Sequence, residues 1–166
     1  PTIVKEAFHI ATSGRQGPVV IDIPKDLTNP DELFDYEYPK KVSIRSYNPP
    51  VEPEQNQVDR VISALKESKR PVIYAGGGTI ASNASDELRE LNSYIKAPVT
   101  NTLMGLGVYP GTDKYFLGML GMHGTYQANM AMHNADLILA IGARFDDRIT
   151  NTCLLYTSPS PRDSDQ

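Results

Sequence analysis

Apolar residues recur in this chain with two different periods, which predict helices and buried strands in a definite order. Intervals of three and four residues predict helices, and they occur over 2–13, from Glu54 through Leu65, from Leu88 to Ile95 and over 124–134. Short β-branched runs bounded by proline or glycine predict buried strands, and they lie at 18–24, 71–75, 98–102 and 137–141. Residues 103–123 are predicted to be a glycine-rich connection.

From Glu54 onward the predicted order is helix, then strand, helix, strand, helix, strand. This alternation predicts an α/β fold, a Rossmann-like parallel sheet with helices on both faces. Ligands of such sheets bind at the carboxyl ends of the strands. Glycine or small polar residues follow the three strands, beginning at Gly76, Asn101 and Gly142. We therefore expect a long ligand across this edge, with glycine letting the backbone come close to it.

The first third of the chain is organised differently. A helix and one strand pattern offer few neighbours for a sheet, which predicts the remnant of another domain. Residues 25–53 hold five of the thirteen prolines and little periodicity, so an extended, fairly stiff segment is expected there. The predicted organisation is the end of a first domain at 1–29, an interdomain linker at 30–53 and a partial central domain at 54–152.

Composition narrows the classes of function. The chain has 166 residues, with 16 Lys and Arg against 20 Asp and Glu, and a formal net charge of -4. Weak acidity argues against a nucleic-acid-binding protein. The absence of a run of about 18 apolar residues argues against a membrane span, and the absence of a basic start before an apolar core argues against a signal peptide. We expect a cytoplasmic protein.

The last fourteen residues differ in character from the rest. From Cys153 to Asp163 the sequence resembles the translation of a transposon-end sequencing adapter over eleven consecutive residues. The alternative is a natural tail rich in serine and proline. We interpret 153–166 as adapter-derived and leave it out of the fold argument. The remaining 152 residues contain no cysteine, and we expect them to be an internal piece of a longer protein.

One glycine-rich segment resembles a nucleotide-binding pattern. Residues 76–81 fit G-x-G-x-x-A directly after a predicted strand. A dinucleotide site also needs an acidic residue at the end of the next strand, and that strand ends in Asn101 and Thr102. The sequence therefore disfavours a standard NAD site, and glycine-rich turns of this kind also arise from packing.

Two other clusters could hold an anionic ligand. Residues 144–148, Arg-Phe-Asp-Asp-Arg, form either a solvated loop with internal ion pairs or a clamp in which guanidinium binds phosphate and carboxylate accepts from a hydroxyl. His123 lies between two glycines, in a simple turn or at a helix N-terminus that could bind an anion. His9 and His133 are expected to be packing residues. No metal-ligand spacing and no nucleophile–base pair is evident.

Several of these motifs together resemble the acetolactate synthase family. Residues 12–26 look like the end of the first domain of its large subunit, with Gln16 where the family more often has proline. Residues 102–107, 120–124 and 142–148 are similar to its central-domain motifs, in the same order. The resemblance covers 1–152 and is closest to the bacterial valine-sensitive type. Leu-Gly-Met-His-Gly with Arg-Phe-Asp-Asp-Arg is its most specific part.

The resemblance implies an enzyme that uses thiamine diphosphate and Mg²⁺. It would decarboxylate pyruvate and transfer the two-carbon unit to pyruvate or 2-ketobutyrate, towards valine, leucine and isoleucine. The central domain would bind FAD, which takes no part in the net reaction. The implied assembly is a homodimer or tetramer of large subunits with a regulatory small subunit.

Site residues are implied by the same motifs. The expected FAD contacts are Arg15, Gly77, Thr102, Leu103, Leu120, Gly121, Met122, His123, Gly142, Arg144 and Asp146. Arg144 and His123 would serve the diphosphate and its surroundings, and Asp146 would accept from a hydroxyl. Residues near the mouth of the substrate channel would be Lys25, Met122, Asp147 and Arg148.

The family's catalytic glutamate and its Mg²⁺-binding motif match nothing in these residues. We therefore expect no catalytic residue in this chain and no activity from the chain alone. One alternative is another thiamine diphosphate-dependent 2-ketoacid decarboxylase or carboligase, such as a glyoxylate carboligase. A different class is a non-catalytic nucleotide-binding module. Residues 144–148 and 45–49 favour acetolactate synthase.

Overall fold

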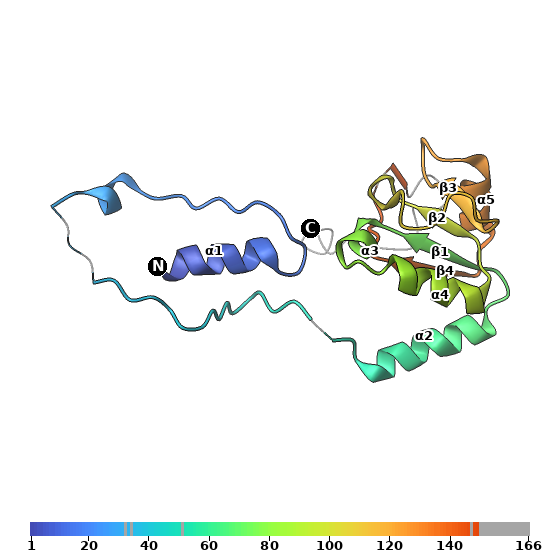
Figure 1. Cartoon of the computed structure of the whole chain (residues 1–166), viewed down its shortest axis with the longest axis horizontal. Coiled ribbons are helices and arrows are strands. Elements are labelled where there is room, and N and C mark those ends of the chain that lie inside the picture. The colour runs from blue at the N-terminus through green and yellow to red at the C-terminus, as the bar shows by residue number, and fades with distance from the viewer. Residues whose placement is uncertain (32, 34, 51, 147, 150–166) are drawn as a thin grey trace, which may run out of the picture. The chain divides into compact units, whose positions relative to one another are not determined.

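A computed structural model of the chain describes residues 1–31, 33, 35–50, 52–146 and 148–149. It divides into two compact units, Pro1–Gln55 and Asn56–Gln166. Each unit is described by itself (Figure 1). No described helix is long and apolar enough to cross a membrane.

The first unit is built around helix α1 (Thr2–Thr12), followed by the short 3-10 helix η1 (Lys25–Thr28). The helix predicted over 2–13 is thus confirmed, whereas the strand predicted at 18–24 is wrong. Those residues have no regular secondary structure, and Val20 is 92% exposed. A lone extended segment needs partner strands and a face to bury, and the described residues of this unit supply no second strand.

Segments far apart in the first unit meet around α1. The Lys5 ammonium donates to the Pro39 carbonyl at 2.5 Å. The Tyr47 hydroxyl donates to the Ser13 carbonyl at 2.7 Å, and the Tyr47 ring lies edge-on to His9 with centroids 5.9 Å apart. Part of the proline-rich segment therefore packs along α1.

The second unit alternates helices and strands. Its elements are α2 (Gln55–Glu67), β1 (Pro71–Ala75), α3 (Gly77–Ala81), α4 (Ser85–Ile95), β2 (Val99–Asn101), η2 (Leu103–Gly105), β3 (Phe116–Met119), α5 (Tyr126–Asn134) and β4 (Leu137–Ile141). The strands form one parallel sheet in the order β3-β2-β1-β4. The predicted α/β fold with a parallel sheet is confirmed.

Strand β3 is a strand that the sequence prediction missed, as it also missed the short helix α3. β3 lies inside the segment taken as a glycine-rich connection. Gly118 interrupts its short apolar run with a φ of +87°, and its pairing with β2 shifts register between Val99 and Asn101. A glycine inside a strand weakens the strand pattern and often marks such an irregularity. The apolar periodicity of the sequence therefore did not predict β3.

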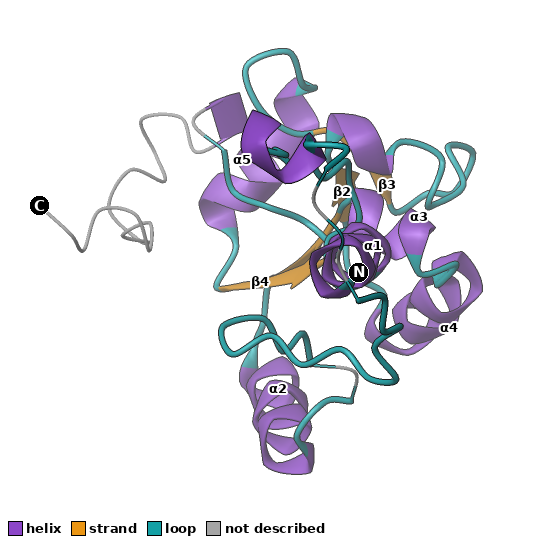
Figure 2. Ribbon diagram, turned by 90° about the vertical axis from the view of Figure 1, so that its left-hand side faces the viewer, coloured by secondary structure: helices purple, strands orange, loops and turns teal. Residues whose placement is uncertain are grey.

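Alternate residues of β1 face two separate cores. Ile73 and Ala75 pack with Leu88 of α4 and Val99 of β2. On the other face, Val72 and Tyr74 pack with Leu120 and with Met132 of α5. Figure 2 shows α4 and α5 on opposite sides of the sheet. This alternation is the two-residue period of a strand buried on both faces.

Helix α4 begins without a side-chain cap. Ser85 and Asp86 lie inside its first turn, and the capping position is Ala84, which makes no side-chain capping bond. Acidic residues in the first turn still favour the positive end of the helix dipole. Near the other end, Asn92 is buried, with its oxygen accepting from the Ala97 amide at 2.9 Å and its amide donating to the Tyr109 hydroxyl at 2.9 Å.

Candidate functional site

The carboxyl edge of the sheet is the candidate site because the strand order reverses there. The chain runs from β1 through β2 to β3 and then returns to place β4 on the other side of β1. In open parallel sheets the loops at such a reversal diverge, and ligands bind at this point. The loop after β1 therefore meets the loop after β4 on one side and η2 on the other.

Glycines at the reversal bring two loops into direct contact. The Gly76 amide donates to the Ile141 carbonyl and the Gly78 amide to the Gly142 carbonyl, both at 2.9 Å. A methyl group at Gly76 would lie 2.3 Å from the Gly142 oxygen. The buried Thr79 hydroxyl adds a bond to the Ile141 carbonyl at 2.9 Å. These glycines admit a neighbouring backbone, and the ligand contacts expected at this edge stay a prediction.

The same contacts occupy several backbone amides of residues 76–81. A phosphate-binding loop needs free backbone amides. Here the Gly76 and Gly78 amides are bonded to β4-side carbonyls, and the Thr79 amide donates to the Gly76 carbonyl at 3.1 Å. These three amides are therefore already bonded within the fold, as a glycine-rich turn formed by packing would have them.

The loop after β1 also contacts η2. A methyl group at Gly77 would lie 3.1 Å from the Met104 Cβ, and one at Gly105 would lie 2.6 Å from the Ala75 oxygen. The Thr102 amide donates to the Ala75 carbonyl at 2.9 Å. The structure thus brings the predicted residues Gly77, Thr102 and Leu103 to one part of the edge.

Buried polar atoms without partners mark the end of β2. The Asn101 Oδ1 and Thr102 Oγ1 atoms have no hydrogen-bond partner among the described residues. The side-chain amide nitrogen of Asn101 donates to the Gly105 carbonyl at 2.9 Å and closes the turn. Next to them, Leu103 and Met104 are 68% and 77% exposed. Unpaired polar atoms beside exposed apolar side chains are what a ligand with a flat apolar body and a polar edge would satisfy.

The turn after β3 is held by Asn129 of α5. Gly121 adopts a φ of +105°. Its backbone amide donates to the Asn129 side-chain oxygen at 3.2 Å, and its carbonyl accepts from the Asn129 side-chain nitrogen at 3.1 Å. The Met122 amide donates to the Arg148 carbonyl at 3.0 Å, which joins this turn to the segment after β4. Met122 and His123 are both exposed.

The structure bears on two expectations about this turn. Helix α5 begins at Tyr126. In its first turn the Ala128 backbone amide donates to the Thr125 hydroxyl at 3.1 Å. The helix start is therefore capped by its own side chain rather than open to an anion at His123. Leu120 is only 4% exposed and its side chain belongs to the core below the edge, while its predicted contact with FAD stays a prediction.

The segment after β4 carries an internal ion pair. The Arg144 Nε lies 2.7 Å from one oxygen of Asp146, and its Nη2 donates to the other at 3.1 Å. Both side chains are substantially exposed. Of the two interpretations of this segment, the structure shows the internal pair, and a ligand phosphate would have to share or replace it.

Tyr74 and Asn101 are candidate residues that sequence reasoning missed. The Tyr74 hydroxyl donates to the Arg144 carbonyl at 3.3 Å. Burial, with the nearby Asp146 carboxylate, raises the pKa of Tyr74 to about 12. The available signal for both was a polar side chain in the last two positions of a buried strand, next to the ligand edge.

The remaining predicted residues belong to other parts of the chain. Arg15 and Lys25 belong to the first unit, where both are exposed. Asp147 and the adapter-like segment from Cys153 lie outside the described residues. His9 is half-buried as expected, whereas His133 is exposed and the buried residue of that turn is Met132. The described residues contain no group of three or more His, Cys, Asp or Glu that could hold a metal ion.

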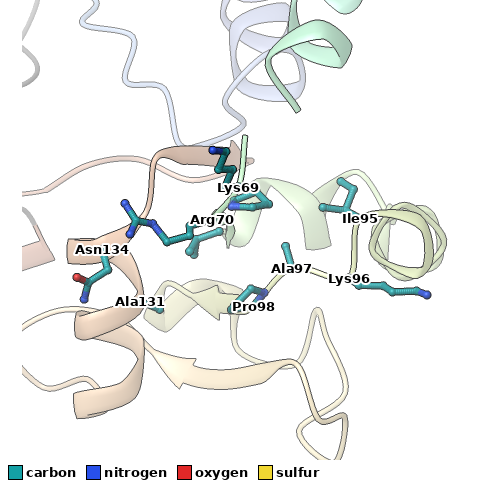
Figure 3. A pocket seen from close by; sticks show the side chains of 10 residues that line it. Lys69, Arg70, Ile95, Lys96, Ala97, Pro98, Ala131 and Asn134 are labelled. Carbon is teal, nitrogen blue, oxygen red and sulfur yellow. The ribbon is translucent and has the colours of Figure 1, made fainter. Parts of the chain in front are cut away.

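A hollow of about 410 Å³ lies at the opposite, amino edge of the sheet (Figure 3). Its lining includes the starts of β1 and β2 and the ends of α4 and α5. Figure 3 shows the Lys69 and Lys96 side chains pointing away from each other rather than converging. Beside it, the Asp136 carboxylate accepts from the Ser68 hydroxyl and from the Lys69 and Arg70 amides, which lowers its pKa to about 2. These bonds hold the start of β1 and indicate no ligand.

Comparison with known proteins gives consistent matches. The family described as thiamine pyrophosphate enzyme, central domain, matches residues 58–164. The acetolactate synthase large subunit of Haemophilus influenzae is 53% identical over 156 residues, covering 94% of this chain and 27% of the relative. Isozyme 3 of Escherichia coli is 50% identical with the same coverage. The chloroplastic enzyme of Arabidopsis thaliana is 44% identical over 158 residues, covering 95% and 23%. The chain spans about a quarter of the length of these relatives.

Proposed function

The chain belongs to the thiamine pyrophosphate enzyme family, whose central domain it carries, and we propose that it is part of an acetolactate synthase large subunit. The observation that carries the proposal is the identity of about one half over nearly all of the chain to relatives of that name. The whole protein would decarboxylate pyruvate and transfer the two-carbon unit to pyruvate or 2-ketobutyrate. Because these relatives are named large subunits, we also propose a regulatory small subunit and a homodimer or tetramer of large subunits.

We propose FAD as the ligand of the carboxyl edge. Its residues fit such a group, because two buried polar atoms at Asn101 and Thr102 lack partners and apolar side chains lie exposed beside them. When bound, FAD supplies a flat ring system with hydrogen-bonding groups at its rim and a diphosphate. Thr102, Leu103 and Met122 would contact the former and Arg144 the latter. Gly77, Gly121 and Gly142 would set the loops that carry these contacts.

Thiamine diphosphate and Mg²⁺ are proposed for other parts of the protein. The described residues offer no cluster of metal ligands. Lys25, Met122, Asp147 and Arg148 would lie near the mouth of the substrate channel, and Arg15 would extend the FAD site. The chain alone is proposed to be inactive and to supply binding and positioning.

A chimaera tests this proposal with activity as the readout. Residues 1–152 would replace the matching segment of the Haemophilus influenzae large subunit, and acetolactate would be measured with pyruvate, thiamine diphosphate, Mg²⁺ and FAD. We expect turnover within about tenfold of the parent. The control replaces the same segment with one carrying Gly142→Val, which should abolish turnover. A correctly folded but inactive chimaera, or turnover by the isolated chain, would contradict the proposal.

A further inference from the structure

The segment after β4 is anchored from below by a tyrosine that is distant in sequence. Tyr74 is 0% exposed, on the face of β1 that packs against α5. Its hydroxyl crosses to the Arg144 carbonyl at 3.3 Å, although seventy residues separate the two. A buried hydroxyl on a central strand thus donates to one carbonyl at the carboxyl edge of the sheet.

Apolar contacts reinforce this anchor on both sides of Arg144. The Phe145 ring lies against the Tyr74 ring with centroids 5.3 Å apart at 50°. Ala143 and Ile149 pack against the same buried cluster as Tyr74. The segment therefore lies on the sheet through these three residues, while Arg144 and Asp146 form their ion pair at its outer side.

We propose that Tyr74 is the positioning residue of the ligand edge, setting where the Arg144 guanidinium and Asp146 carboxylate are presented. The carbonyl held by Tyr74 belongs to Arg144 itself, so its release moves the Cα that carries the guanidinium. Among the described residues, the Arg144 side chain bonds only to Asp146. The position of the guanidinium therefore depends on the backbone. The consequence for FAD rests on the function proposed above, whereas the placement of the segment does not.

The test compares two tyrosine variants of the full chain. Tyr74→Phe removes the hydroxyl and keeps the ring. Tyr109→Phe is the matched control, because Tyr109 is also buried and its hydroxyl is also bonded, to Asn92, in the other core. Trypsin cleaves after arginine, so the initial rate of cleavage between Arg144 and Phe145 is measured by mass spectrometry under native conditions.

We expect Tyr74→Phe to raise this rate about two- to tenfold, the factor that one hydrogen bond is worth, and Tyr109→Phe to leave it unchanged. An unchanged rate in Tyr74→Phe, or an equal rise in both variants, overturns the proposal. FAD affinity is measured in parallel and should fall by a similar factor in Tyr74→Phe alone. If the unmodified chain binds no FAD, the proposed ligand fails, while the cleavage rates still decide the role of Tyr74.

Discussion

Two neighbouring parts of the carboxyl edge differ in whether their buried polar groups have hydrogen-bond partners. Between β1 and β4, the loops bond to each other through Gly76, Gly78 and Gly142 and satisfy their backbone groups internally. At the end of β2, the polar atoms of Asn101 and Thr102 are buried without partners, beside exposed Leu103 and Met104. The comparison teaches that the segment richest in glycine closes the fold, while the adjoining turn leaves polar atoms without partners, and that turn is where we propose the ligand.

The largest effect is expected where the loops touch. In Gly142→Ala, the new methyl group would lie 2.3 Å from the Thr79 nitrogen at a φ of +58°. We expect a loss of more than about 3 kcal/mol in the free energy of unfolding, because backbone strain and overpacking add. Denaturant unfolding measures it.

Gly107→Ala is the control for this change, because Gly107 has a φ of +98° but nothing within 4 Å of the added methyl group. Strain alone should cost about 1–2 kcal/mol there. Equal losses at Gly142 and Gly107 would show that the two loops are not packed as described.

The next effect concerns charge at the two edges of the sheet. Arg144→Gln should change the unfolding free energy by less than about 0.5 kcal/mol, since its ion pair is exposed. The same change should weaken FAD binding about tenfold at low salt, as expected for a lost charged hydrogen bond. Lys96→Gln, at the amino-edge hollow, should leave FAD binding unchanged. Isothermal titration calorimetry measures the FAD affinity of both variants. A larger loss of affinity in Lys96→Gln would show that FAD binds at the amino edge instead.

A pair of threonines sharpens the comparison further. Thr102→Val removes the unpartnered hydroxyl, so the unfolding free energy should hold or rise slightly while FAD affinity falls about fivefold. Thr79→Val removes a hydroxyl bonded to Ile141, so stability should fall by about 1 kcal/mol with FAD affinity unchanged. Both are measured by denaturant unfolding and calorimetry. The reverse pattern would mean that the glycine-rich loop, not the β2 turn, meets the ligand.

A titration tests the cover over Tyr74. The pKa of Tyr74 is raised to about 12 by burial and by Asp146, against about 10 in an unfolded chain. The folded state therefore holds its proton more tightly, and the unfolding free energy should decrease as pH rises from about 10 towards 12. The difference in tyrosinate absorbance between the original chain and Tyr74→Phe reports this step. Ionisation of Tyr74 near pH 10 would mean that the segment does not cover it.

The fold was largely predictable because its elements follow clear periods. β1 and β4 lie where the β-branched runs place them, and the parallel order follows from the alternation of elements. β3 escaped because Gly118 breaks its apolar run, and the strand at 18–24 failed because a run of that kind needs partners that the described residues of its unit lack. Periodicity describes a segment, while strand formation also depends on its neighbours.

The edge of the sheet that carries the candidate site could be proposed from the order of the elements, whereas the contacts of its residues could not. Glycine at a strand end indicates close approach without saying what approaches, so the contact between Gly76 and Gly142 could not be told from a ligand contact. The bond from Tyr74 to Arg144 joins positions far apart in sequence, and no local pattern reports it. The unpartnered oxygen of Asn101 depends on the surrounding packing in the same way.

Amide hydrogen exchange of the full chain with and without FAD tests the central claim most directly. The account predicts that FAD slows exchange at residues 101–106 and 120–123, where the turn after β2 and the turn after β3 lie. The Gly76 and Gly78 amides, already bonded to the β4 side, should be slow in both states and unchanged by FAD. New protection at Gly76 and Gly78 with none at 101–106 would contradict the account, as would the absence of any FAD-dependent change.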